Sequence, residues 1–262
     1  MNNRIRSVYL LGFLLLAACG GEGVIGPTRT ATVHRSWPAA DLRQIRVFEV
    51  SGSVKVEAAP TTEISLDATV RGRIRPRSDS ENQGLFITEI DGDTLRISRR
   101  QKKRHFNFFF DRDNVRVDYV LRVPPSVSLD MKTINGRIIT RGIEGETQAS
   151  TVNGTIDVEV TGAEQLSATT VNGRVRAKFT RSFQGARFKT VNGGVEAILP
   201  NDASFSVELA QVNGDFEASF PLSIHSQPGS RRVSGEVNGG QHRLKIVTVN
   251  GDVELTRLND SL

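Results

Sequence analysis

Residues 189–199 read K-T-V-N-G-G-V-E-A-I-L, and the letters T-V-N-G within them recur along the chain. Identical copies stand at 151–154, 170–173 and 248–251, and near copies read T-I-N-G at 133–136 and Q-V-N-G at 211–214. Asn-Gly is an ordinary turn signal, but a turn alone does not require the same Thr and Val before it. The recurrence therefore indicates a structural repeat rather than a set of independent turns.

Alignment on this motif defines a repeat whose copies are 16 to 21 residues apart. Ile or Val precedes the Asn position, Gly follows it, and Ile, Val or Phe stands three residues after it in every copy. An earlier segment, V-S-G-S-V at 50–54, fits the same template. The Asn position itself is occupied by Asn135, Asn153, Asn172, Asn192, Asn213, Ser234 and Asn250.

Two all-β architectures accommodate this repeat. In a single-stranded β-helix, or β-solenoid, of about seven or eight coils, equivalent positions stack, so that Val forms an apolar column and Asn a hydrogen-bonded ladder. In a β-meander, each Asn-Gly is a hairpin turn, but then the Val before the turn faces outward with no reason to recur. The solenoid is favoured because it explains every column, and the meander stays open as the alternative.

The N-terminus has the features of a lipoprotein signal peptide over residues 1–18. Arg4 and Arg6 precede an apolar run too short to span a membrane, and the run ends in L-A-A-C-G at 16–20, which resembles a lipobox. The resemblance implies cleavage before Cys19, a diacylglycerol on its thiol and an acylated amino terminus. Gly20 in place of an Asp retention signal then favours the outer membrane of a Gram-negative-type envelope. Cys19 is also the only cysteine, so no disulfide is expected.

The rest of the chain divides into three parts. Residues 19–40 are rich in Gly and Pro near their start and are expected to form a tether, residues 41–258 the repeat domain, and residues 259–262 a tail. The repeats, the R-V-P-P segment at 122–125 and the ending G-E-V-N-G-G-Q-H-R-L-K-I-V-T-V-N-G-D-V-E-L resemble the bacterial putative-adhesin family of unknown function. This resemblance spans roughly residues 30–258 and implies a β-helix on the cell envelope, with no established activity.

The sequence contains no recognisable catalytic set, so the protein is not expected to be an enzyme or to need a cofactor. Four scattered histidines lack metal-ligand spacing, and no G-x-S-x-G motif or phosphate-binding loop occurs. Two residues after the Asn position, a stacked column would contain Asp215, Glu236 and Asp252, which are weak candidates for Ca²⁺ binding or paired-carboxylate chemistry.

The segment 99–113 combines a basic run with clustered phenylalanines and departs from the family pattern. Lys102, Lys103 and Arg104 are candidates for docking on anionic lipid, with the Phe residues inserting. The alternative is a long hairpin whose Phe residues cap the end of the solenoid core.

The function expected from the sequence is a lipid-anchored envelope protein with a non-catalytic binding or adhesion surface. Its partner is expected to be a glycan or another envelope protein, and no nucleic acid is expected for an exported lipoprotein. Two alternatives remain: an accessory or sensory component of envelope-stress signalling, and a β-helix enzyme acting on polysaccharide.

Overall fold

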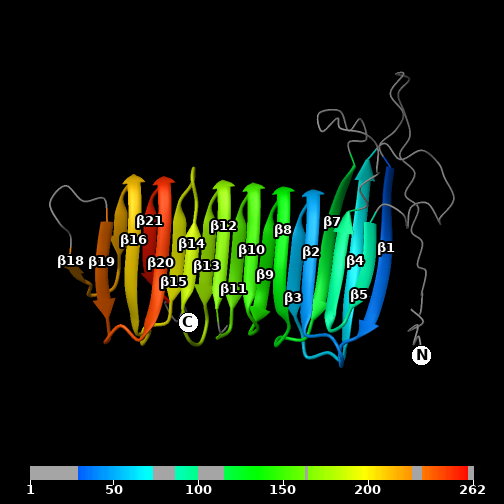
Figure 1. Ribbon diagram of the computed structural model, residues 1–262, viewed down its shortest axis with the longest axis horizontal. Coiled ribbons are helices and arrows are strands. Elements are labelled where there is room, and N and C mark those ends of the chain that lie inside the picture. Colours follow the sequence, from blue (N-terminus) through cyan, green and yellow to red (C-terminus); the bar gives the residue numbers. More distant parts are fainter. Residues whose placement is uncertain (1–28, 73–85, 100–114, 163–164, 226–231, 259–262) are drawn as a thin grey trace, which may run out of the picture.

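The computed structural model describes residues 29–72, 86–99, 115–162, 165–225 and 232–258. In this part of the chain the regular structure consists of β-strands, which form two facing sheets in one elongated stack (Figure 1). No helix long and apolar enough to cross a membrane occurs among these described residues. The all-β fold expected from the short alternating segments is confirmed.

The two sheets have ten and eleven strands, called here sheet A and sheet B. In spatial order, sheet A contains β1 (Arg29–Pro38), β4 (Glu63–Gly72), β7 (Arg116–Val123), β3 (Val54–Ala58), β9 (Ile138–Ile143), β11 (Ile156–Val160), β13 (Val175–Phe179), β15 (Val195–Leu199), β21 (Val253–Arg257) and β17 (Phe216–Ala218). Sheet B contains β18 (Ser223–His225), β19 (Arg232–Val237), β16 (Phe205–Asn213), β20 (His242–Asn250), β14 (Ala186–Lys189), β12 (Leu166–Asn172), β10 (Thr147–Asn153), β8 (Ser128–Asn135), β2 (Gln44–Ser51), β6 (Thr94–Arg99) and β5 (Phe86–Asp91).

Each T-V-N-G segment connects a strand of sheet B to a strand of sheet A. The strands β12 and β13 on either side of Asn172-Gly173 therefore do not pair with each other; β12 pairs in parallel with β10, and β13 with β11. In this register Thr170 lies beside Thr151 and Asn172 beside Asn153. The repeats thus stack as coils in a solenoid-like fold, and the β-meander alternative is wrong, because a hairpin requires its two strands to be antiparallel neighbours.

The coils do not follow one another in simple sequence order. The last coil, β20–β21, inserts between β14–β15 and β16–β17, so that Ala186 and Val207 both pair with Leu244. Strand β19 runs antiparallel to β16 and forms part of the return path. The spatial order of the coils therefore departs from the sequence order at the C-terminal end of the stack.

Antiparallel strands close most ends of the two sheets. Strand β1 pairs with β4 over ten residues, from Arg29 opposite Gly72 to Pro38 opposite Glu63. The interval 19–40 had been expected to be a tether, but its residues 29–38 belong to sheet A. Strand β5 pairs with β6 at the corresponding end of sheet B, and β18 pairs with β19 at the other end.

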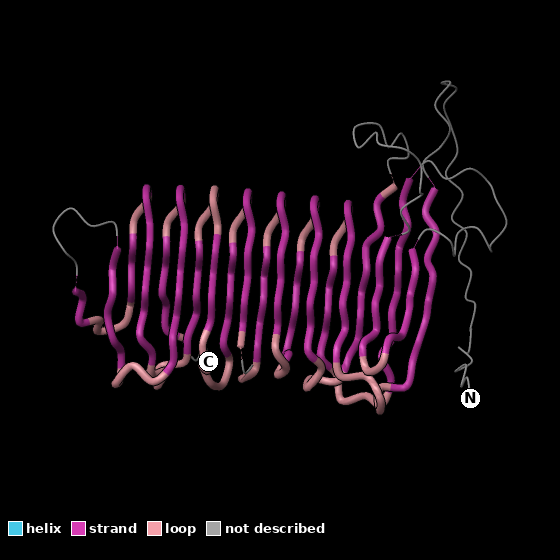
Figure 2. The backbone as a smooth tube through the Cα atoms, viewed as in Figure 1, coloured by secondary structure: helices cyan, strands magenta, loops and turns pink. Residues whose placement is uncertain are grey.

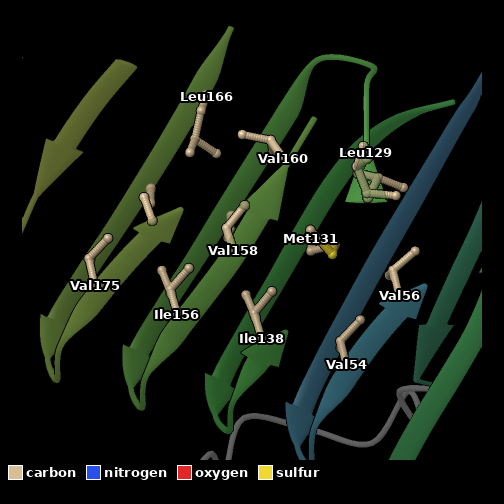
Figure 3. Close-up of a cluster of buried hydrophobic side chains, with 14 of the residues drawn as sticks. Val54, Val56, Leu129, Met131, Ile138, Ile156, Val158, Val160, Leu166 and Val175 are labelled. Carbon is tan, nitrogen blue, oxygen red and sulfur yellow. The ribbon is translucent and has the colours of Figure 1, made fainter. Parts of the chain in front are cut away.

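The core lies between the sheets and is built from the inward residues of every coil. Along sheet A, Val54, Ile138, Ile156 and Val175 follow one another and are completely buried (Figure 3). Each fully buried aliphatic side chain of this size contributes about 1.5–3 kcal/mol to folding. Because buried and outward residues alternate along the strands, each sheet has one outer face. The T-V-N-G connections between the sheets form a row of tight turns along the upper edge in Figure 2.

Candidate binding surface

The row of tight turns forms a ridge along the stack. We call it the T-V-N-G ridge and define it as residues 133–137, 151–155, 170–174, 190–194, 248–252 and 211–215, in their spatial order. Each turn contributes one residue to each of five columns, which correspond to Thr, Val, Asn, Gly and the residue after Gly. The surface is therefore periodic, with a spacing of about 4.8 Å between coils.

The threonines of this column are buried, and all but Thr133 bond to the neighbouring coil. Thr170 Oγ1 donates a hydrogen bond to the carbonyl oxygen of Gly154 at 3.2 Å. Thr151, Thr190 and Thr248 make the equivalent bond to the glycine of the neighbouring coil at 3.3–3.4 Å. In Q-V-N-G, Gln211 replaces Thr, and its Nε2 donates to the carbonyl oxygen of Gly251 at 2.9 Å. The hydroxyl thus explains why the motif begins with Thr.

The Val column lies on the surface. The members with the largest exposure, each between 37% and 41% exposed, are Ile134, Val152, Val171, Val212 and Val249. Each β-branched side chain stands beside its equivalent in the next coil, which covers part of it but leaves the outer side open to solvent. The expected apolar column is therefore present as an exposed stripe and not as part of the core.

The Asn column forms an amide ladder in which every bond points the same way. Asn153 Nδ2 donates to Asn135 Oδ1 at 2.9 Å, and Asn172 Nδ2 donates to Asn153 Oδ1 at 2.8 Å. The series continues from Asn192 to Asn172, from Asn250 to Asn192 and from Asn213 to Asn250 at 2.8–2.9 Å. These parallel amide dipoles polarise one another along the stack.

Ser234 does not belong to this ladder. It lies in the antiparallel strand β19, opposite Glu208 of β16, within sheet B. The segment R-V-S-G-E-V has the alternation of the repeat, but alternation is common to strands of either direction. The assignment of Ser234 to the Asn column was therefore wrong.

The proposed acidic column is also incomplete. Asp215 and Asp252 are neighbours, and Asp252 Oδ1 accepts a hydrogen bond from the backbone N–H of Asp215 at 3.0 Å. Glu236 lies in β19 opposite Ser206, in the other sheet. The described residues contain no group of three His, Cys, Asp or Glu side chains placed to hold a metal ion. The three-carboxylate site suggested by the sequence therefore does not form, because strand β19 is not a coil.

A buried polar cluster that no sequence pattern predicts lies at the Thr position of the coil β2–β3. Glu49 pairs with Thr133 in register and is completely buried. Its carboxylate accepts hydrogen bonds from the hydroxyl of Tyr119 at 2.8 Å and from the backbone of Val50 at 2.9 Å, and it forms an ion pair with Arg99 at 3.4 Å. Burial raises the pKa of Tyr119 well above its ordinary value, and the negative charge of Glu49 raises it further.

The remaining predicted site residues lie outside the described residues. These are Cys19, Lys102, Lys103 and Arg104. Arg99, the first residue of the basic segment 99–113, ends β6 and forms the ion pair with Glu49.

The outer faces carry charged side chains in straight rows. On sheet B, Arg187 of β14 lies beside Lys245 of β20. On sheet A, Glu254 lies between Glu196 and Glu217, and Arg176 neutralises Glu196 at 3.3 Å. One end of the stack thus has a basic sheet B face and an acidic sheet A face, which suits it to binding by charge complementarity.

Three solved structures illustrate the similarity of this chain to known proteins. A putative cell adhesion protein from Clostridium sporogenes has a TM-score of 0.48 and 9% identity, with 88% of this chain and 100% of that chain covered. A putative adhesin from Bacteroides fragilis has a TM-score of 0.41 and 10% identity, with 86% and 97% covered. A putative lipid binding protein from Parabacteroides distasonis has a TM-score of 0.33 and 16% identity, with 86% and 96% covered.

A search of curated proteins finds no match to this chain. A family model described as Toastrack DUF4097 matches residues 38–256, from the end of β1 into β21. Since this match covers most of the sequence, the chain belongs to the Toastrack DUF4097 family.

Proposed function

We propose that this protein is a non-catalytic binding protein of the bacterial cell envelope, anchored to the membrane by lipid on Cys19. In this proposal, the single-stranded β-helix expected from the repeats is a rigid scaffold that holds outward side chains at fixed spacing. Its partner is a glycan or another envelope protein, and the outer membrane is the proposed location. The lipobox-like segment at 16–20 supports the anchor, and the rows of outward charge support the binding role.

The observation that carries the binding role is the like-charge pair Arg187 and Lys245 on the outer face of sheet B. Like charges directly opposite each other on a sheet are destabilising, so this pair itself adds nothing to the stability of the scaffold. Lys189 and Arg243 lie on the same two strands, and Glu208 is close to Arg243 and lies 4.0 Å from Lys245. This excess of positive charge favours an anionic glycan as the ligand.

A glycan array probed with the full-length protein tests the binding role. We expect retention on anionic glycans, and we expect the double variant Arg187→Glu/Lys245→Glu to lose it, since both changes oppose the ligand charge. The matched control is Arg176→Glu/Lys178→Glu, an equal change of charge on the outer face of sheet A. Equal retention by both double variants would exclude the sheet B face as the binding surface.

Fractionation of cells tests the anchor separately. The wild-type protein is expected in the membrane fraction and released only by detergent, because several acyl chains hold a protein firmly in a bilayer. The Cys19→Ser variant, which cannot be lipidated at that position, is expected in the soluble fraction. Retention of this variant in the membrane fraction would contradict lipid anchoring at Cys19.

A further inference from the structure

The column formed by the residue after Gly in each turn of the T-V-N-G ridge has opposite charges at its two ends. This column precedes the strands of sheet A, and in spatial order it reads Arg137, Thr155, Arg174, Gly194, Asp252 and Asp215. The two arginines and the two aspartates are exposed. The arginines precede the aspartates in the sequence as well, but β20–β21 inserts before β16–β17, so that Asp252 follows Gly194 in space and Asp215 comes last.

The exposed stripe runs beside this charged column along the same ridge. Its spatial order is Ile134, Val152, Val171, Val191, Val249 and Val212. Five of these six β-branched side chains are exposed and Val191 is half-buried. A row of this kind flanked by polar groups is typical of an interaction surface. The apolar stripe can therefore supply contact area, while the charged column determines the orientation in which a partner binds.

When a second copy is turned end to end, opposite charges face each other in the charged column and apolar side chains face each other in the stripe. With a twofold axis across the ridge, midway between the coils of Val171 and Val191, Arg137 faces Asp215 of the second copy. Thr155 then faces Asp252, and the apolar stripe faces itself. We propose that two copies of this chain associate through their T-V-N-G ridges in this antiparallel arrangement.

A parallel arrangement does not give the same match. A twofold axis along the stack exchanges the two sides of the ridge, so the apolar stripe of one copy would face the charged column of the other. Only the antiparallel axis places each column against itself and reverses its charge order. The resulting interface is isologous, and each Arg137–Asp215 contact occurs twice.

The side chains of the charged column are already held in place within one copy. Arg137 Nε donates to Thr155 Oγ1 at 3.0 Å, and Asp252 Oδ1 accepts from the backbone of Asp215 at 3.0 Å. Six coils at about 4.8 Å give a ridge only roughly 24 Å long, which is short for a stable interface. The association is therefore weak and weakens further as salt concentration rises.

Sedimentation velocity of the full-length chain over a range of concentrations tests this dimer, with the same detergent in every sample. We expect a reversible monomer–dimer equilibrium for the wild type. Arg137→Asp and Asp215→Arg should each raise the dimer dissociation constant about tenfold, because each creates two like-charge contacts. The double variant Arg137→Asp/Asp215→Arg should restore the wild-type value, because both contacts are again attractive with their charges exchanged.

Arg46→Asp is the matched control, since Arg46 is an exposed arginine on the outer face of β2, away from the ridge. It should leave the dissociation constant unchanged. If a charge reversal prevents folding, as judged by circular dichroism, Arg137→Gln and Asp215→Asn replace it and should each weaken the dimer about threefold. A wild-type chain that stays monomeric at all concentrations, or a double variant as weak as the single ones, overturns the proposal. The glycan-array result does not bear on this outcome, because Arg187 and Lys245 lie off the ridge.

Discussion

The glycine of the motif is required by the neighbouring coil more than by its own turn. A Cβ atom added to Gly154 would lie 1.8 Å from the carbonyl oxygen of Gly136, and one added to Gly173 would lie 1.9 Å from that of Gly154. Real Cβ contacts are never this short, so the two coils would have to separate. The same close approach recurs along the ridge, which explains why this column contains glycine in every copy.

Gly154→Ala should therefore lower the free energy of unfolding by about 3 kcal/mol or more, or prevent folding altogether, because rigid backbone faces the added methyl group. Gly92→Ala is the control. Gly92 has a φ of +62° but no atom within 4 Å of the added Cβ, so only backbone strain of about 1–2 kcal/mol is expected. Urea unfolding of both variants measures the difference, and equal losses would contradict the role of coil-to-coil contact.

The threonine of the motif gives a second, milder prediction at this scale. Thr170→Val keeps the shape of the buried side chain but removes the hydroxyl that bonds to Gly154 O. The carbonyl loses a partner, so we expect a destabilisation of about 1–2 kcal/mol. Thr169→Val on the outer face of the same strand should change stability by less than about 0.5 kcal/mol. Thermal unfolding of the two variants distinguishes them, and a harmless Thr170→Val would mean that the hydroxyl is dispensable.

At the scale of elements, the coils could be predicted because identical residues in successive copies have a physical reason to stack. Asn172 bonds to the equivalent Asn153 of the neighbouring coil, and Thr170 lies in register with the equivalent Thr151, so the repeat in the sequence directly reflects contacts in the fold. The direction of a strand is not encoded in this way. Val233 and Val237 alternate as coil residues do, yet their strand is antiparallel, and for this reason Ser234 and Glu236 were misplaced.

The cluster around Glu49 could not be predicted because it depends on contacts distant in sequence. Tyr119 lies 70 residues after Glu49, and no local pattern joins them. Strand β1 was missed for the same reason, since it pairs with β4 across a long stretch of chain, from Pro38 opposite Glu63 to Arg29 opposite Gly72. Such contacts arise at the end of the stack, where the repeat no longer determines which strand lies beside which.

The Tyr119–Glu49 bond predicts a loss of stability at high pH. Tyrosine in the unfolded chain ionises near pH 10, whereas burial beside a carboxylate raises the pKa of Tyr119 in the folded state. Above about pH 10 the unfolded state releases a proton that the folded state retains. The free energy of unfolding should therefore fall with rising pH, with a contribution from this group of up to about 1.4 kcal/mol per pH unit.

Tyr119→Phe should remove this contribution and should cost about 1–3 kcal/mol at neutral pH, because Glu49 loses a donor. Urea unfolding between about pH 9 and pH 11 measures both effects. Thr169→Val, on the outer face of β12 and away from Glu49, is the control and should keep the wild-type slope. An unchanged slope in Tyr119→Phe would show that this hydroxyl does not govern the alkaline loss.

At the scale of the whole molecule, the last coil in sequence is an interior coil in space. Strand β20 pairs with β14 on one side and with β16 on the other, and β21 similarly lies between β15 and β17. The stack is therefore completed only when the C-terminus of the chain enters a gap between coils that precede it. Contacts of such large sequence separation form slowly, so folding of this end is expected to be late.

Truncation after Gly240 tests this arrangement. Four completely or almost completely buried side chains are lost with the last coil, Leu244, Ile246, Val253 and Leu255, and at about 1.5–3 kcal/mol each they equal the stability of an ordinary domain. In addition, β14 and β16 lose the neighbour that joins them, so the shortened chain should show no cooperative unfolding transition. Truncation after Leu258, which keeps β20 and β21, should unfold like the wild type. If the chain ending at Gly240 kept a cooperative transition at the wild-type urea midpoint, its last coil would be a dispensable end coil and the interior position would be wrong.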